Sequence, residues 1–229
     1  MIKKIIRKGK FILKKALYSD LTDNGERVDV IYKKGIKFDT LDMYQKSHYR
    51  RYEFAQGFIN GGVVADFACG NGYGTVMLSQ KGDRVIGADI SKSTVDKISK
   101  RYASINNVKF VTKNLLDLEY KDFFDTIVSF ETIEHFKASD IPSLFAVFHT
   151  ALKPDGQFIF SVPYMQEQSE NAIKMGFHLT FDIDEKTIGR WLQDAGFTAD
   201  IWRYQNYETH TIEDVLEQKD FIICVARKI

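Results

Sequence analysis

The chain has 229 residues, of which 44% are hydrophobic and 14% aromatic. This is enough for one buried core with an appended segment. Its 32 basic and 31 acidic residues nearly balance, but residues 1–17 hold lysines and arginines and no acid, so the rest of the chain is acidic. An acidic core without a basic groove argues against a nucleic-acid enzyme. No stretch has the ~18 consecutive apolar residues of a membrane span. The two cysteines, Cys69 and Cys224, suit a reduced, cytoplasmic protein.

The N-terminal residues 1–43 are expected to form a segment separate from the main domain, which we assign to residues 44–229. Within residues 1–17 the apolar side chains fall near one face of a helix and the basic ones on the other. Such a helix binds either an anionic membrane surface, here the inner face of the cytoplasmic membrane, or its own domain or a partner subunit. Residues 18–43 contain turn signals and predict an irregular or partly β connection. The oligomeric state stays open.

Regular alternation of elements dominates residues 44–229. A first helix is expected at 42–58. Strands are expected at 63–67, 84–88, 108–112, 125–130, 157–162, 199–204 and 219–226, and further helices near 73–80 and at 92–104, 140–152 and 185–195. A βα series of this kind predicts an α/β fold with a doubly wound, largely parallel sheet and helices on both faces. A ligand then belongs at the carboxyl ends of the strands, where the strand order reverses.

The best ligand signal is the glycine-spaced turn Gly70-Asn71-Gly72-Tyr73-Gly74, which follows the apolar strand 63–67. Glycines allow positive φ and close approach of a ligand, and the next helix offers free N–H groups. The spacing alone is weak evidence. However, the second strand ends in Asp89, about 20 residues later, where a carboxylate binds ribose hydroxyls in Rossmann-type folds. Together these features indicate an adenosine-containing ligand.

Four blocks of the chain carry a resemblance to class I S-adenosylmethionine (SAM) methyltransferases: Asp66 to Gly74, Val85 to Ile90, Phe124 to Phe136 and Leu152 to Pro163. The resemblance covers roughly residues 44–229. It implies a Rossmann-like, seven-stranded, mostly parallel sheet with one antiparallel strand, and SAM as cofactor. One departure is Ala68, where the family usually has a glycine, and we expect only a slight local adjustment there.

The resemblance also assigns cofactor contacts. Asp66 would position the amino-acid end of SAM, Asp89 the ribose, and an arginine on the helix before the first strand the carboxylate. The full set of expected contacts is Tyr44, Arg51, Asp66, Ala68, Gly70, Gly72, Asp89, Ile90, Asn114, Leu115 and Phe130. Alternatives stay open for three of them. Arg51 is otherwise a solvent-exposed arginine, Asn114 a plain turn residue, and Asp89 a helix N-cap, although Ser91 and Ser93 are better placed to cap.

Candidate catalytic residues cluster in the segment Phe130 to Phe136. His135 is a candidate general base, and Glu131, which comes shortly before it in the sequence, is another candidate catalytic residue. His178 lies in the long connection that varies with substrate in this family, and it is a second candidate base. Glu131, Glu134 and His135 also resemble the metal ligands of some quinone-biosynthesis methyltransferases, so a divalent metal is left open. In the plainest alternative, these residues stabilise the loop after the fourth strand. Methyl transfer needs alignment, and a base only for a protonated nucleophile.

The sequence as a whole predicts a SAM-dependent methyltransferase acting on a small-molecule or glycan acceptor. Similarity to methyltransferases of bacterial polysaccharide biosynthesis favours a sugar hydroxyl. The alternatives are a quinone or natural-product O- or N-methyltransferase and a catalytically silent SAM-binding scaffold. A nicotinamide dehydrogenase is disfavoured because no sequence remains for its catalytic domain, and nucleic-acid methylation because the base-flipping motif is absent.

Overall fold

The computed structural model describes residues 28–30, 36–169 and 178–229. The expected amphipathic helix at 1–17 and most of the expected connection at 18–43 lie outside these residues. Within the described ranges, no helix is both long enough and apolar enough to span a bilayer.

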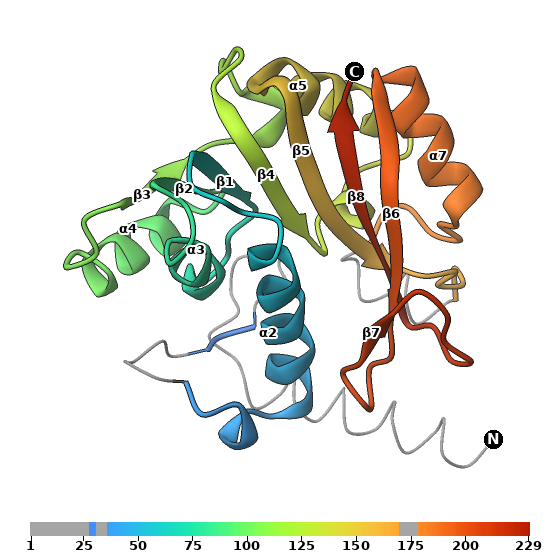
Figure 1. Ribbon diagram of the computed structural model, residues 1–229, viewed down its shortest axis with the longest axis horizontal. Coiled ribbons are helices and arrows are strands. Elements are labelled where there is room, and N and C mark those ends of the chain that lie inside the picture. The colour runs from blue at the N-terminus through green and yellow to red at the C-terminus, as the bar shows by residue number, and fades with distance from the viewer. Residues whose placement is uncertain (1–27, 31–35, 170–177) are drawn as a thin grey trace.

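The centre of the domain is one mixed sheet in the order β3-β2-β1-β4-β5-β8-β6-β7 (Figure 1). The strands are β1 (Val63–Phe67), β2 (Arg84–Asp89), β3 (Val108–Thr112), β4 (Phe124–Phe130), β5 (Leu152–Pro163), β6 (Phe197–Gln205), β7 (Ile212–Glu213) and β8 (Phe221–Lys228). The strands β1 to β5 pair in parallel, and β8 inserts antiparallel between β5 and β6. This confirms the Rossmann-like, mostly parallel fold. The count is eight rather than seven because β7, only two residues long, adds an edge strand too short to predict.

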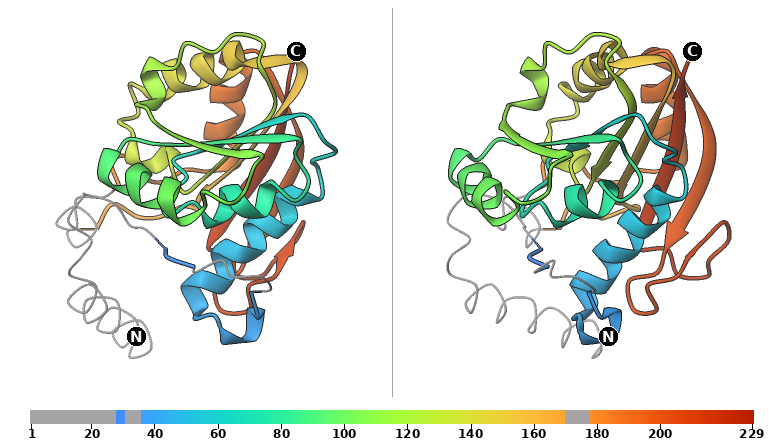
Figure 2. Two further views of the ribbon diagram at one scale, coloured as in Figure 1. Left: turned by 90° about the vertical axis from the view of Figure 1, so that its left-hand side faces the viewer. Right: turned by 60° about the vertical axis from the view of Figure 1, so that its left-hand side comes forward.

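Helices cover both faces of the sheet, as the βα alternation predicts. The α-helices are α2 (Met43–Gln56), α3 (Tyr73–Leu78), α4 (Lys92–Arg101), α5 (Ile141–Ala151) and α7 (Glu185–Asp194), with short 3₁₀ helices η1 (Phe38–Thr40), η2 (Leu115–Asp117) and η3 (Ile133–His135). The helices α5 and α7 pack on one face, and α2, α3 and α4 on the other (Figure 2). Every helix expected within the described residues is present, within a few residues of its predicted ends.

Local sequence explains where the helices begin. Asp42 forms a capping box with Gln45 at the start of α2: the Asp42 carboxylate accepts from the backbone N–H of Gln45, and the Gln45 side chain accepts in return. Ser91 and Asp184 cap α4 and α7 in the same way, each accepting from the N–H three residues on. Caps of this kind stabilise a helix by about 1 kcal/mol each. The expectation that Ser91, rather than Asp89, caps α4 is confirmed.

The larger core lies between the sheet and the helices α5 and α7. It is rich in fully buried aromatic rings, including Phe145, Phe148, Phe158 and Phe160. The rings of Phe158 and Phe160 stack with centroids 4.5 Å apart. Each side chain of this size contributes on the order of 1.5–3 kcal/mol by leaving water. The sheet is therefore tightly packed on the face covered by α5 and α7.

The second core joins α2 and α3 to the sheet at one very close approach. Gly74, the last glycine of the spaced turn, lies directly under the ring of Tyr52 on α2. A Cβ atom at Gly74 would lie 2.0 Å from Cζ of Tyr52, far inside van der Waals contact. Gly74 is therefore required by the packing between α2 and α3. This contact fixes α2 against the end of residues 68–72, which we call the cofactor loop.

We expect Gly74→Ala to lower the free energy of unfolding by about 1–3 kcal/mol, because the added methyl group forces Tyr52 and α2 to move. Urea unfolding followed by circular dichroism measures this. The matched control is Gly189→Ala, since nothing lies within 4 Å of a Cβ at Gly189 in α7. There the same change should raise stability by about 0.5–1 kcal/mol. Equal effects of the two substitutions would contradict the packing role of Gly74.

Candidate cofactor and acceptor site

Several of the expected site residues lie at the carboxyl ends of β1, β2 and β4. β1 pairs with β2 on one side and β4 on the other, so the strand order reverses at β1, and the sheet's ligand edge is expected there. The cofactor loop follows β1, Asp89 ends β2, and Glu131 follows β4. The structure thus brings together segments that are separate in the sequence.

Asp89 holds the cofactor loop to the second strand. One carboxylate oxygen of Asp89 accepts from the backbone N–H of Gly70 at 3.0 Å, and the other from the N–H of Ser91 at 2.9 Å. The side chain is only 6% exposed. These two bonds orient the Asp89 carboxylate between the cofactor loop and the start of α4. Its expected contact with ribose hydroxyls stays a prediction. The neighbouring Ile90 is 71% exposed and presents an apolar side chain beside this carboxylate.

Within the cofactor loop, the non-glycine residue with a left-handed backbone is Ala68, the position that departs from the family pattern. Gly70 and Gly72 have φ of 51° and 73°, which glycine adopts freely, and Ala68 has φ of 59°. A left-handed conformation costs an L-residue roughly 1–2 kcal/mol. Ala68 therefore holds this left-handed conformation at a cost in stability. The slight local adjustment expected there stays a prediction.

We expect Ala68→Gly to raise the free energy of unfolding by about 1 kcal/mol, because it removes the Cβ that opposes the left-handed conformation. Thermal and urea unfolding of the full chain measure it. Ala146→Gly, at an exposed position in α5, is the control and should lose about 1 kcal/mol. A loss of stability in Ala68→Gly as well would show that the strain inferred from φ is not present in solution.

Asp66, at the end of β1, is fully buried and bonded to two hydroxyl groups. Its oxygens accept from Tyr52 Oη at 3.1 Å and from Thr75 Oγ1 at 2.6 Å. Burial raises the pKa of Asp66 to about 7, against the opposing effect of those two hydrogen bonds. In the absence of a cation the carboxyl is therefore half-protonated near neutral pH. A positively charged ammonium group nearby would favour the carboxylate form.

The raised pKa of Asp66 predicts a specific pH dependence of stability. The unfolded carboxyl titrates near 3.8 and the folded one near 7, so the folded state holds a proton that the unfolded state has lost. The contribution is complete below about pH 4 and is lost as the pH rises through 7, with a slope of up to about 1.4 kcal/mol per pH unit. Asp66→Asn should remove this slope, as measured by urea unfolding across that range. The exposed change Asp96→Asn should leave it in place, and parallel curves for Asp66→Asn and wild type would contradict the assignment.

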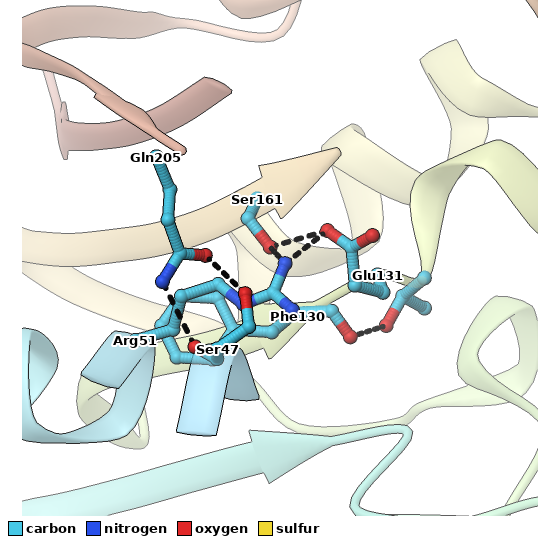
Figure 3. Close-up of polar contacts among 7 residues, drawn as sticks. Ser47, Arg51, Phe130, Glu131, Ser161 and Gln205 are labelled. Atoms are coloured by element: carbon cyan, nitrogen blue, oxygen red, sulfur yellow. Dashed lines mark hydrogen bonds and ion pairs between the residues drawn. The ribbon is translucent and has the colours of Figure 1, made fainter. Parts of the chain in front are cut away.

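Arg51 is buried under α2 and forms an ion pair at the end of β4 (Figure 3). One guanidinium nitrogen lies 2.8 Å from Glu131 Oε1 and 3.4 Å from Ser161 Oγ, and Ser161 also donates to Glu131 at 2.7 Å. The guanidinium lies over the ring of Phe221. Since Arg51 is 1% exposed, the solvent-exposed alternative is wrong. Its predicted contact with the SAM carboxylate stays a prediction, and the structure gives Arg51 an anionic partner within the protein.

A second pair of bonds joins α2 to the end of β6. Ser47 donates from Oγ to the Gln205 side chain, whose amide donates back to the Ser47 carbonyl, both at 3.0 Å (Figure 3). Both residues are fully buried. Four residues of this region were not predicted from the sequence: Ser161, Gln205, Tyr52 and Thr75. Ser47 and Arg51 are four residues apart, a spacing that places both on one side of α2.

The remaining expected cofactor residues are placed as follows. Tyr44 packs its ring edge-on against Tyr207, with centroids 5.0 Å apart, and Phe130 is buried against the ring of Tyr52. Asn114 accepts from the backbone N–H of Leu116 at 3.1 Å, so the turn role foreseen for it is present. Leu115 is buried at the start of η2. The adenine contacts expected of Asn114 and Leu115 stay predictions.

The structure regroups the candidate catalytic residues. Potential ligand atoms of Glu134, His135 and His178 all lie within 4.8 Å of one another. Glu131 is not in this group, because its backbone turns at φ 51° and its side chain meets Arg51 and Ser161 instead. The expected trio of Glu131, Glu134 and His135 is therefore not assembled in this structure. The residues of this Glu–His–His group are brought together by tertiary structure that sequence spacing does not reveal.

His178 faces His135, with ring centroids 5.0 Å apart. Burial and the neighbouring His135 lower the pKa of His178 to about 4. The imidazole is then neutral near pH 7, and so low a pKa makes it a weak general base. His149 lies in α5 and His210 in the loop between β6 and β7.

The cofactor loop also contains a thiol, Cys69, which is 4% exposed. Burial raises its pKa well above the usual range, so the unreactive thiol form prevails. Cys224 is fully buried in β8 and its pKa is raised for the same reason. Both cysteines are free. Neither carries the exposed thiolate of a catalytic or redox-active cysteine.

Comparison with known proteins shows which family this site region is similar to. Residues 64–156 match the family described as a methyltransferase domain. That range runs from β1 into β5 and includes the cofactor loop, Asp89 and the Glu131 turn. This stretch of the chain is therefore similar to a methyltransferase domain. Glycan biosynthesis, the narrower resemblance, receives no support from this match.

Individual relatives agree with this class. A probable SAM-dependent methyltransferase of Mycolicibacterium smegmatis is 33% identical over 145 residues, which are 61% of this chain and 53% of that protein. This chain thus spans about half of that relative's length. Two solved structures share the fold at 19% identity. The first is the magnesium protoporphyrin IX methyltransferase of Synechocystis with bound S-adenosylhomocysteine, which has a TM-score of 0.64 over 87% of this chain and 91% of that one. The second is the 1,6-didemethyltoxoflavin-N1-methyltransferase of Burkholderia thailandensis with bound 1,6-didemethyltoxoflavin and S-adenosylhomocysteine, which has a TM-score of 0.62 over 78% of each chain.

Proposed function

We propose that this protein is a SAM-dependent methyltransferase that methylates a small-molecule or glycan acceptor. The observation that carries the proposal is the pair of buried carboxyls, Asp66 and Asp89, at the carboxyl ends of adjacent strands on either side of the cofactor loop. The loop supplies positive-φ glycines, and an exposed Ile90 stands next to Asp89. An ammonium, a ribose and an adenine ring are the groups that such a set fits.

The protein's own contribution to the reaction is positioning. Bound SAM supplies an activated sulfonium methyl group, so the chain must align the nucleophile with it and exclude water. Asp89 accepts from the ribose hydroxyls, and Asp66 holds the amino-acid end and becomes ionised beside its positive charge. Arg51 and Glu131 form the wall at the end of β4, where the acceptor approaches. His135, half-exposed on η3, is the remaining candidate base for a hydroxyl acceptor.

Two chemical classes of acceptor fit this proposal, and a different observation favours each of them. The motifs favour a sugar hydroxyl of a glycan intermediate, and the basic residues 1–17 would bring the enzyme to lipid-linked substrates at a membrane. The two solved relatives above act on a tetrapyrrole and on a toxoflavin precursor, which favours a small ring system. An acceptor screen with nucleotide sugars, glycans in anionic vesicles, quinols and heteroaromatic compounds separates the two. Turnover of sugars alone supports the first, and turnover of ring compounds alone the second.

We expect calorimetric titration of the full chain to show SAM binding in the micromolar range and none for NAD. Asp89→Ala should weaken SAM binding on the order of 100-fold, because two hydrogen bonds to a charged group are lost. Asp96→Ala, an exposed aspartate on α4, is the matched control and should bind as wild type. Thermal unfolding checks that Asp89→Ala is folded.

Two results would count against the proposal. A folded protein that does not bind SAM would overturn the enzyme assignment. SAM binding without turnover of any acceptor in the screen would instead favour a SAM-binding scaffold.

A further inference from the structure

The Glu–His–His group (Glu134, His135 and His178) is built by two segments held together at several points. Glu134 and His135 belong to η3. His178 directly precedes Leu179 and Thr180, which are hydrogen-bonded to η3 and to the residue after it. The Glu134 carbonyl accepts from the backbone N–H groups of Leu179 at 2.7 Å and Thr180 at 3.1 Å, and the Thr180 hydroxyl donates to the Phe136 carbonyl at 2.7 Å. Three hydrogen bonds therefore fix the approach of His178 to η3. The juxtaposition is a property of the backbone arrangement and not of one side-chain rotamer.

The three donors are of complementary kinds. Two neutral imidazoles and one carboxylate are a common ligand set for divalent ions of the first transition row and for zinc. Donor atoms around a tetrahedral zinc ion are about 3.3 Å apart at the usual bond lengths. The donors here lie within 4.8 Å of one another, so small side-chain rotations are enough to close the set on an ion. The two histidines already stand with ring centroids at 5.0 Å.

The surroundings of Glu134 and His178 also favour binding of a metal ion. The side chain of Glu134 is 1% exposed, and in so low a dielectric a carboxylate interacts more strongly with a divalent ion than it would at the surface. Gln166 lies beside His178, with Oε1 at 2.6 Å from Nδ1. An amide oxygen only accepts, so Nδ1 carries the proton and Nε2 carries a lone pair. A second contact of this kind is what orients ligating histidines in metal sites.

We propose that Glu134, His135 and His178 form a binding site for one divalent ion of the zinc class, oriented by Gln166. Magnesium and calcium prefer all-oxygen ligand sets, so the two imidazoles select against them. Three protein ligands leave at least one coordination position for water or another oxygen. The site lies just after β4, next to the Arg51–Glu131 pair, and shares no residue with the two carboxyls proposed to hold SAM. Metal binding is therefore testable without SAM or an acceptor.

The test is titration of untagged, chelator-stripped full-length protein with zinc, followed by calorimetry, and with cobalt, followed by its visible absorption. We expect one ion per chain and a cobalt spectrum typical of four- or five-coordination. His178→Ala and His135→Ala should each weaken zinc binding by more than 100-fold. Gln166→Leu should weaken it about 10–100-fold, as loss of a histidine-orienting contact does. His178→Asp, which retains a ligand, should recover part of the affinity.

His210→Ala is the matched control, because His210 lies in the loop between β6 and β7, outside the group, and should bind zinc as wild type does. Thermal unfolding of each apo variant separates loss of a ligand from loss of the fold. The proposal is overturned if the folded wild-type protein takes up no zinc or cobalt. It is also overturned if His178→Ala and His135→Ala bind as wild type does, which would make the contact between the two rings ordinary packing. Neither result bears on SAM binding, so the proposed function stands or falls separately.

Discussion

The ion pair between Arg51 and Glu131 fixes the first helix of the domain over the ligand edge of the sheet. Both groups are largely withdrawn from water, and the Ser161 hydroxyl bonds to both. Breaking a buried pair of this kind leaves an uncompensated charge and typically costs 3–5 kcal/mol. Together with the bonds from Ser47 to Gln205 and from Tyr52 to Asp66, it connects α2 to β1, β4, β5 and β6. Buried side-chain bonds thus join the helix and the strands that surround the cofactor loop.

Much of this could be predicted from sequence because the information is local. Each buried strand of the parallel sheet is a short apolar run, and each major helix has its cap or its periodic apolar face nearby. Asp66 and Asp89 end strands, so the fold rule alone places them at one edge. The eighth strand escaped because two residues carry no periodicity. The strain at Ala68 escaped because a residue's φ depends on the turn that contains it.

The candidate catalytic residues were harder, and for a physical reason. Glu131, Glu134 and His135 are close in sequence, yet a left-handed residue followed by a 3₁₀ turn sends Glu131 toward Arg51 and leaves the other two beside His178. Proximity in sequence says little about side-chain direction across such a turn. Likewise, burial of Arg51 depends on partners from β4 and β5, which no pattern within α2 reveals.

The thiols of Cys69 and Cys224 are both buried, but different parts of the structure must open before each becomes accessible to solvent. Cys69 lies in the cofactor loop, whose N–H at Gly70 is held by Asp89, while Cys224 lies in β8 between β5 and β6. Regions with fewer neighbours open at lower free energy than the centre of a sheet. Alkylation of Cys69 therefore follows fluctuations of the loop, and alkylation of Cys224 follows separation of the sheet itself. The natural chain thus carries one chemical reporter for local opening and another for global unfolding.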